Sequence, residues 1–161
     1  MGILLICIST YAQTYITPSS GSTSINTCYG TLYDPGGTSN YSNSCSGYII
    51  IYPQTSGCKV HLEGSYNTES SYYDHIDIYD GAGTYGTQLM SVGGTGNINV
   101  TSTTGPITVQ FITDGSVTYS GYELAISCVG GCTCGGAPFG ITQSIITQGV
   151  NLSWVAGEGV S

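Results

Sequence analysis

The feature that most constrains the fold is the stretch from Tyr66 to Gly81, in which polar and apolar side chains alternate from Asp74 onward. Ile76 and Ile78 are separated by polar residues, and this period of two is typical of a β-strand with one buried face. Asp80 and Gly81 come next, and an Asp-Gly pair is typical of a tight turn because glycine accepts a positive φ. The stretch therefore predicts a half-buried strand that ends in a turn.

Short segments of the same kind recur through the chain, separated by Gly, Asn, Ser or Thr. The expected strands are 48–52, 59–65, 74–79, 88–92, 97–101, 106–113 and 122–128. No segment has helical periodicity over a useful length, and repeated short strands with turns between them predict an all-β, antiparallel β-sandwich. The expected inward-facing residues are Val60, Leu62, Ile76, Ile78, Ile98, Val100, Ile107, Val109, Phe111, Tyr122, Leu124 and Ile126.

Charged side chains are scarce, and nearly all of them are acidic. They make up 6% of the 161 residues, the net charge is −8, and Lys59 is the only basic residue. Nucleic acids and anionic lipid surfaces are bound through clusters of Lys and Arg. The composition therefore excludes both as partners.

The first 27 residues predict an exported chain. Residues 1–12 contain a short apolar run at 3–8 followed by Ser-Thr-Tyr-Ala12, which is typical of the end of a secretory signal with cleavage after Ala12; an apolar N-terminal strand is the alternative. No apolar run approaches the roughly 20 residues that a membrane span needs. Residues 13–27 are rich in Ser and Thr and predict a linker or an edge segment. We therefore expect a secreted or cell-surface protein.

Six cysteines remain after the apolar N-terminal run. An even number in an exported chain indicates disulfides, but six cysteines allow 15 pairings and the sequence does not choose among them. A zinc site formed by the last three is the alternative, although structural zinc sites usually show paired Cys-x2–4-Cys spacing. The six are Cys28, Cys45, Cys58, Cys128, Cys132 and Cys134.

Three separated carboxylates, Glu69, Asp74 and Asp114, each fall next to an expected strand end. If they meet at one end of the sandwich, they provide the oxygen ligands that calcium prefers, with loop carbonyls near Ser116 completing the shell. Asp34 is the first residue of an Asp-Pro-Gly-Gly turn, and we expect it to cap that turn. The alternative is that the three carboxylates are ordinary strand-end residues.

The order and spacing of several short motifs resemble a CUB domain, from about Cys28 to Cys128. The pair Tyr66-x-x-Glu69 resembles the aromatic-x-x-Glu of that family. The segment 73–81 resembles its YD-x-hydrophobic-x-hydrophobic-YDG core. The remaining matches are Asn40-Tyr41, Cys45 followed by 48–53, Phe111-x-Thr113-Asp114 and Gly121-Tyr122.

This resemblance implies a jelly-roll-like sandwich with calcium bound by Glu69, Asp74 and Asp114 near Ser116. It also implies a disulfide between Cys28 and Cys45. In such a domain the calcium orders the loops at one end, and these loops bind a partner, often through a basic group of that partner. Tyr41 and Tyr73 are expected to line this surface because tyrosine offers apolar area and a hydroxyl at low entropic cost.

The C-terminal part differs in composition from the CUB-like segment. Residues 129–137 are rich in Cys and Gly and predict a linker. Residues 138–161 resemble the start of a fibronectin type III module. Because two strands cannot hold an independent core, this segment continues in a longer protein or pairs with another subunit by strand addition.

No catalytic motif occurs in the sequence, so we expect a non-enzyme. His61 with Glu63, and His75 with Asp77, each share one strand face, which we interpret as the hydrated face of a sheet rather than a metal cluster. Three sequons are candidate glycosylation sites, at Asn40, Asn99 and Asn151.

The leading functional hypothesis is a calcium-dependent module that recognises an extracellular protein or glycan. The alternatives are a structural subunit of an extracellular filament or matrix, assembled through 138–161, and the targeting domain of an exported hydrolase.

Overall fold

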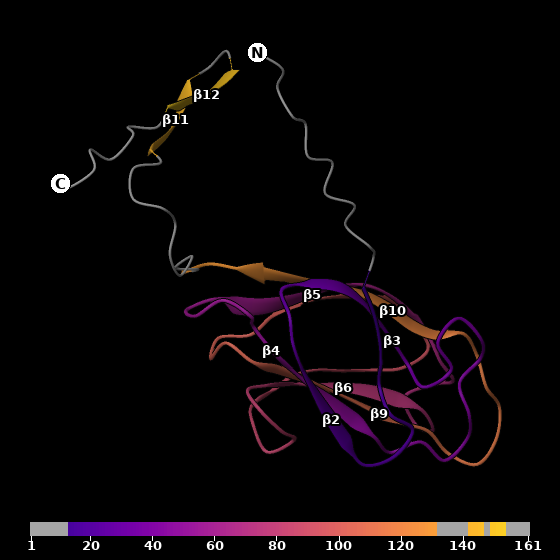
Figure 1. The fold of residues 1–161 in the computed structure, drawn as a ribbon. Helices are drawn as coiled ribbons and strands as arrows, with labels where there is room; N and C mark the ends of the chain where they lie inside the picture. The colour runs from indigo at the N-terminus through magenta and orange to yellow at the C-terminus, as the bar shows by residue number, and fades with distance from the viewer. Residues whose placement is uncertain (1–12, 132–141, 147–148, 154–161) are drawn as a thin grey trace.

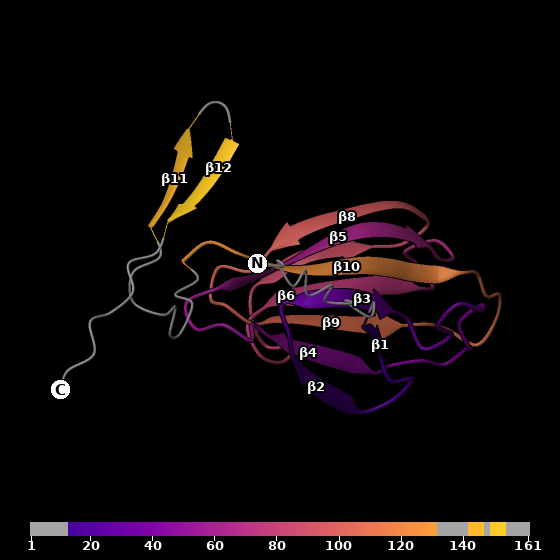
Figure 2. The ribbon, with the colours of Figure 1, turned by 45° about the horizontal axis from the view of Figure 1, so that its top comes forward.

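The computed structural model describes residues 13–131 and two further strands at 142–146 and 149–153. Within 13–131, ten strands form two five-stranded sheets that lie face to face (Figure 1). One sheet has the order β1-β3-β10-β5-β8, and the other has the order β2-β4-β9-β6-β7 (Figure 2). The strands of the first sheet are β1 (Thr14–Ile16), β3 (Tyr29–Tyr33), β10 (Gly121–Val129), β5 (Lys59–Asn67) and β8 (Thr95–Thr101). Those of the second are β2 (Ser22–Asn26), β4 (Tyr48–Tyr52), β9 (Ile107–Ile112), β6 (His75–Asp80) and β7 (Gln88–Val92).

The predicted all-β sandwich is confirmed, and its two sheets are mixed rather than wholly antiparallel. β1 pairs with β3 in parallel, and β2 pairs with β4 in parallel. These two strands come from 13–27, and each lies at the edge of its sheet. A Ser- and Thr-rich segment is compatible with a strand in this position, because an edge strand pairs with a neighbouring strand on one side only.

The core lies between the sheets and matches the predicted inward-facing set. Of that set only Val100 is not fully buried, and it packs against the others. Phe111 from β9 contacts Tyr41 and Tyr122 edge-on, with ring centroids 5.0 Å and 5.5 Å apart. Edge-to-face contacts of this kind stabilise beyond the area that they bury. Since Tyr122 lies on β10, this aromatic group joins the two sheets.

The disulfide predicted by the resemblance is wrong: Cys28 bonds Cys128, not Cys45. The antiparallel pairing of β3 with β10 places Ser127 opposite Tyr29, so Cys28 and Cys128 lie side by side at one end of the sandwich. Cys45 is free and buried, and its backbone bonds to Thr113 beyond the end of β9. That position lies at the opposite end of the sandwich, roughly one strand length away, beyond the reach of a disulfide.

Cys58 is also disulfide-bonded. Cys132 and Cys134 lie outside the described residues. A zinc site that includes Cys128 is excluded because its sulfur is already oxidised in the bond to Cys28.

The β11 strand (Thr142–Ile146) and the β12 strand (Gly149–Ser153) pair with each other as an antiparallel hairpin. The fibronectin-like likeness and the linker at 129–137 remain predictions, since residues 132–141 and 154–161 lie outside the described ones.

The Asp80-Gly81 turn holds the loop between β8 and β9 through a buried carboxylate. Oδ1 of Asp80 accepts hydrogen bonds from the amides of Thr103 and Thr104 at 2.9 Å and 3.1 Å, and the hydroxyls of both threonines donate as well. Burial raises the pKa of Asp80, but these four donors favour the ionised form more strongly, and the net pKa lies below its ordinary value.

We expect Asp80→Asn to destabilise the protein at pH 7 by about 2 kcal/mol, because hydrogen bonds to a charged group are worth more than neutral ones. A lowered folded-state pKa contributes stability above the unfolded pKa of about 3.9, and this contribution is lost as the pH falls through the folded-state value. Urea unfolding of wild type and variant at pH 7 and at about pH 2 measures this. The free-energy difference between them has to shrink in acid, and an equal difference at both pH values contradicts the assignment.

Candidate functional site

Two loops, β5–β6 and β9–β10, carry three acids at the end of the sandwich opposite the Cys28–Cys128 disulfide. Glu69 follows β5, Asp74 precedes β6 and Asp114 follows β9. Because β6 is antiparallel to β9, with His75 opposite Ile112, the last two are neighbours. One carboxylate oxygen from each of the three acids lies within 4.8 Å of the others. The structure therefore brings together the three carboxylates that the sequence singled out.

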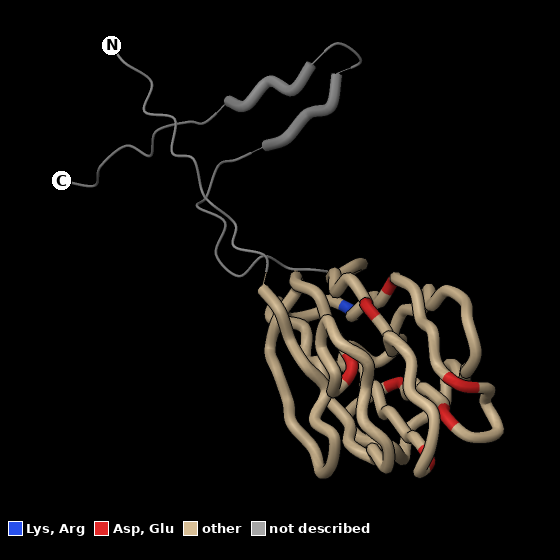
Figure 3. The backbone as a smooth tube through the Cα atoms, turned by 90° about the vertical axis from the view of Figure 1, so that its right-hand side faces the viewer, with Lys and Arg blue, Asp and Glu red and all other residues tan. Residues whose placement is uncertain are grey.

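Asp74 is the buried centre of this group, with 0% of its surface exposed. Its Oδ2 accepts a hydrogen bond from the Tyr41 hydroxyl at 2.5 Å, and its Oδ1 accepts one from the Asp114 amide at 2.9 Å. The only basic residue of the chain, Lys59, begins β5 and so lies at the far end of that strand (Figure 3). The buried charge is therefore stabilised by neutral donors rather than by an ion pair.

The contacts of Glu69 indicate most clearly that these acids bind a partner that the protein itself does not provide. Its Oε2 is buried and has no hydrogen-bond partner. Burial raises the pKa of Glu69, and the negative charges of Asp114 and Asp74 raise it further. A buried acceptor without a donor is costly, and three carboxylates in close contact repel one another.

Tyr41 does not line the surface, and the prediction that it contacts a partner is wrong. Only 2% of this residue is exposed, and its ring packs against Phe111. Its hydroxyl donates to Asp74 and accepts a hydrogen bond from the Glu69 amide at 3.1 Å. Burial, followed by the bond to Asp74, raises the pKa of Tyr41 far above its ordinary value. Tyr41 is thus a neutral donor that positions two of the three acids.

The segment 40–46 is joined to 113–119 by successive hydrogen bonds. The amide of Ser44 donates to the Asp114 carbonyl at 2.6 Å, and the amide of Tyr41 donates to the Tyr119 carbonyl at 3.1 Å. Ser44 and Val117 have positive φ values of 60° and 53°. A β-branched residue rarely adopts this conformation, and such strain is found most often at functional sites.

Ser116 and Asp34 are two further residues that the sequence singled out. The amide of Ser116 donates to Asp114 Oδ1 at 2.8 Å, so Ser116 belongs to the same loop as the acids, as the sequence predicted. Asp34 is fully buried and caps its own turn through the Gly36 amide at 2.7 Å. It also accepts from the Tyr122 amide at 3.0 Å, and burial raises its pKa.

The two loops that carry the acids also expose several large apolar side chains. Tyr73 is half exposed, at 54%, which is compatible with its predicted role in a binding surface. Tyr72, Val117 and Tyr119 are also exposed and come from the same two loops. Sequence analysis missed these three, because period-two patterning says nothing about residues in loops.

The two histidine–acid pairs lie on different sheets and form no common cluster. His61 and Glu63 are on β5, with 3.8 Å between Nε2 and Oε2. His75 and Asp77 are on β6, with 3.6 Å between Nε2 and Oδ2. Because β5 and β6 belong to opposite sheets, the pairs cannot share a metal.

The glycosylation sites remain predictions. Asn40 is exposed, and its side-chain amide donates to the Thr118 carbonyl at 3.3 Å. Asn99 is exposed on β8. The side chain of Asn151 lies outside the described residues.

Comparison with known proteins identifies the fold family. The family model for the CUB domain matches residues 21–125. The full extracellular region of zebrafish Gpr126/Adgrg6 superposes with a TM-score of 0.58 at 19% identity, over 67% of this chain and 14% of that one. The CUB1-EGF-CUB2 domains of rat MASP-1 superpose with a TM-score of 0.55 at 16% identity, over 67% and 42%. The human MASP-1/3 CUB1-EGF-CUB2 domain gives 0.50 at 19%, over 66% and 41%.

This chain therefore corresponds to less than half the length of each of these structures. The curated proteins contain no match. Within the described residues, no helix has the length and apolar character to cross a membrane.

We expect Tyr41→Phe to lower the free energy of unfolding by about 1–3 kcal/mol, because Asp74 loses a buried donor and the Glu69 amide loses its acceptor. Tyr73→Phe is the matched control, since it removes a hydroxyl from an exposed ring, and it should change stability by less than about 0.5 kcal/mol. Urea unfolding in EDTA measures both. Equal stability of the two variants would show that the Tyr41 hydroxyl does not hold these loops together.

Proposed function

The chain belongs to the CUB domain family, and we propose that it is a secreted recognition module whose three loop carboxylates, Glu69, Asp74 and Asp114, bind calcium. CUB domains are extracellular binding modules without catalytic activity, and the resemblance to extracellular regions supports the same location here. The proposal rests on one observation above all, the buried and unpartnered Glu69 Oε2 beside two further carboxylates.

The geometry of the acids suits calcium. Calcium binds six to eight oxygens at about 2.3–2.6 Å, so two oxygens that share one ion lie at most about 5 Å apart. The oxygens of Glu69, Asp74 and Asp114 lie within 4.8 Å of one another. A divalent cation offsets their repulsion and gives Glu69 Oε2 a partner. Because all the side-chain ligands are oxygens, a hard cation is favoured over zinc or copper. We propose that carbonyls near Ser116, together with water, complete the shell.

The other half of the proposal concerns the partner. The loops that carry the three acids also expose four apolar side chains, Tyr72, Tyr73, Val117 and Tyr119. A Lys or Arg side chain suits this surface, because its apolar stem packs on tyrosine while its charged head approaches the carboxylates. We propose that the loops bind an extracellular protein through such a residue, and that calcium fixes the loops in the binding conformation.

The filament and hydrolase-targeting hypotheses stay predictions. β11 and β12 pair with each other, and this pairing satisfies one edge of each strand while leaving the other edge for addition. Whether a catalytic domain accompanies this chain is a separate question from what the loops bind.

We expect calcium to raise the melting temperature of the full chain in a saturable way, relative to EDTA. Binding to the folded state alone stabilises by about 2.7 kcal/mol at a hundredfold excess over the Kd. Glu69→Gln and Asp114→Asn should reduce the calcium affinity at least tenfold. Both substitutions keep the shape of the side chain, so the variants should fold in EDTA. Calorimetric titration with calcium gives the affinities directly.

Glu63→Gln is the matched control, because Glu63 is an exposed acid on β5 and lies outside the loops that carry the proposed calcium ligands. It removes the same charge and should leave calcium affinity unchanged. No calcium-dependent shift in the wild type, or equal loss in all three variants, overturns the calcium proposal.

A further inference from the structure

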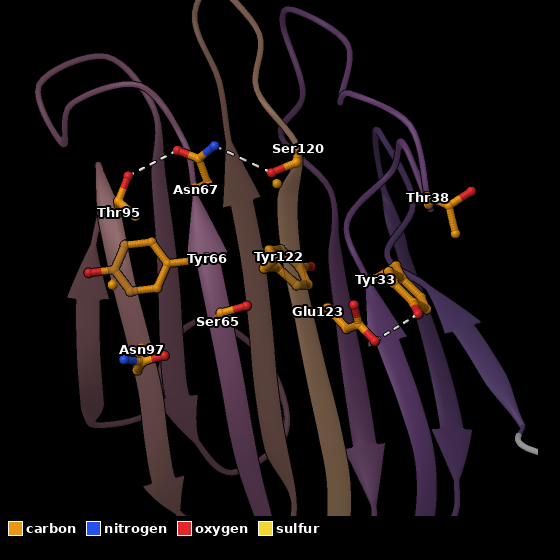
Figure 4. A pocket seen from close by; sticks show the side chains of 13 residues that line it. Tyr33, Thr38, Ser65, Tyr66, Asn67, Thr95, Asn97, Ser120, Tyr122 and Glu123 are labelled. Carbon is orange, nitrogen blue, oxygen red and sulfur yellow. Dashed lines mark hydrogen bonds between the residues drawn. The ribbon is translucent and has the colours of Figure 1, made fainter.

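A polar groove lies on the outer face of the β3-β10-β5-β8 layer, apart from the acidic loops (Figure 4). It has a volume of about 620 Å³, which is in the range of pockets that hold small ligands. Four neighbouring strands contribute to it, so its length across the sheet is about 14 Å. We propose that this groove binds a neutral oligosaccharide.

The shape of the groove follows from side-chain size on the outer face. Ser65 on β5 and Gly121 on β10 are small and form its floor. Tyr33 and Glu123 stand on one side, and Asn97 stands on the other (Figure 4). Because Ser65 pairs with both Glu123 and Asn97, these side chains flank it directly.

The chemistry of the lining matches hydroxyl groups. Asn67 accepts from the Thr95 hydroxyl at 3.0 Å, and its amide contacts Ser120 Oγ at a long 3.4 Å. An Asn side chain offers two donors and two acceptor sites, so Asn67 and the exposed Asn97 retain capacity for a ligand. Amide groups that donate and accept side by side suit neighbouring sugar hydroxyls.

The charge of the groove excludes an anionic ligand. Its only charged side chain is Glu123, which accepts a hydrogen bond from the Tyr33 hydroxyl at 3.0 Å. Lys59 lies six residues from Ser65 along β5, roughly 20 Å away. A sulfated or sialylated chain would therefore meet a carboxylate and no counter-charge, whereas a neutral sugar meets amides, hydroxyls and the flat face of Tyr33.

A peptide fits less well than a sugar. β10 and β5 are inner strands of the sheet, so their backbone groups are already paired on both sides and cannot accept an added strand. Tyr33 and Tyr66 are the only aromatic side chains of the groove that are not buried, and a protein interface usually needs several buried apolar anchors.

The test uses the full, ¹⁵N-labelled chain and four neutral probes: cellotetraose, chitotetraose, mannotetraose and maltotetraose. We expect at least one probe to shift the amide signals of Ser65, Asn97 and Glu123 in a saturable way, with a Kd of about 1 mM or tighter. Ser65→Tyr fills the floor and should weaken binding at least tenfold. Asn97→Ala removes one hydrogen-bonding group and should weaken it about fivefold.

Ala125→Tyr is the matched control, because Ala125 is exposed on the same sheet and does not line the groove. It adds the same ring and should leave binding unchanged. Sugar binding should also persist in EDTA and in Asp114→Asn, so this proposal and the calcium proposal can fail separately. The inference is overturned if no probe binds at roughly 10 mM, if the shifts centre on the acidic loops, or if Ser65→Tyr binds as well as the wild type.

Discussion

The contact between the Tyr41 hydroxyl and the Asp74 carboxylate is the interaction on which the loop end depends. Asp74 is wholly buried, and an isolated carboxylate in such a place costs several kcal/mol unless it is hydrogen-bonded. Tyr41 supplies one donor at 2.5 Å, and the Asp114 amide supplies another. The same hydroxyl accepts the Glu69 amide. The phenol oxygen therefore joins the β3–β4 loop to the β5–β6 loop, and Asp74 joins the β5–β6 loop to Asp114. The ring of Tyr41 is anchored in the core by Phe111.

The two ends of the sandwich are built in opposite ways. At one end, the Cys28–Cys128 disulfide closes a separation of 100 residues, and Asp80 has a donor for each of its oxygens. At the other end, Glu69 Oε2 has no partner, and three carboxylates converge. A disulfide across so long a loop stabilises mainly by restricting the unfolded chain. The stability that the disulfide contributes offsets the repulsion between the carboxylates at the opposite end, and a bound ligand can reduce this repulsion.

Much of this architecture can be predicted from the sequence, because the cause is local. The alternation of polar and apolar residues predicts both ends of β4 and of β7 correctly, and it places Ile76 and Ile78 in the core. It fails for β1, β2 and β3, since these segments are rich in Ser, Thr and Gly and owe their strand structure to their neighbours. The order of the motifs was enough to predict that the three acids lie close together, although the spacing of the acids alone does not require it.

The remaining errors share one origin, which is contact between segments distant in sequence. Cys28 bonds Cys128 because β3 and β10 pair in one register, and no count of cysteines contains that information. Tyr41 lies in a polar segment that would ordinarily be exposed, and it is buried because 40–46 folds onto 113–119. The outer groove likewise cannot be predicted from the sequence, since its lining comes from four strands and two loops.

The end of β3 shows how closely the loop end and the groove depend on each other. Three successive residues serve three purposes: Leu32 is buried in the core, Tyr33 forms one side of the groove, and Asp34 caps the following turn. A Cβ on Gly121 would lie 1.9 Å from Asp34 Oδ2, and its φ of +73° is one that glycine accepts readily. The missing side chain thus lets a buried carboxylate bond the Tyr122 amide. Gly121 also lines the groove, so the position that the turn requires to be glycine is part of the groove as well.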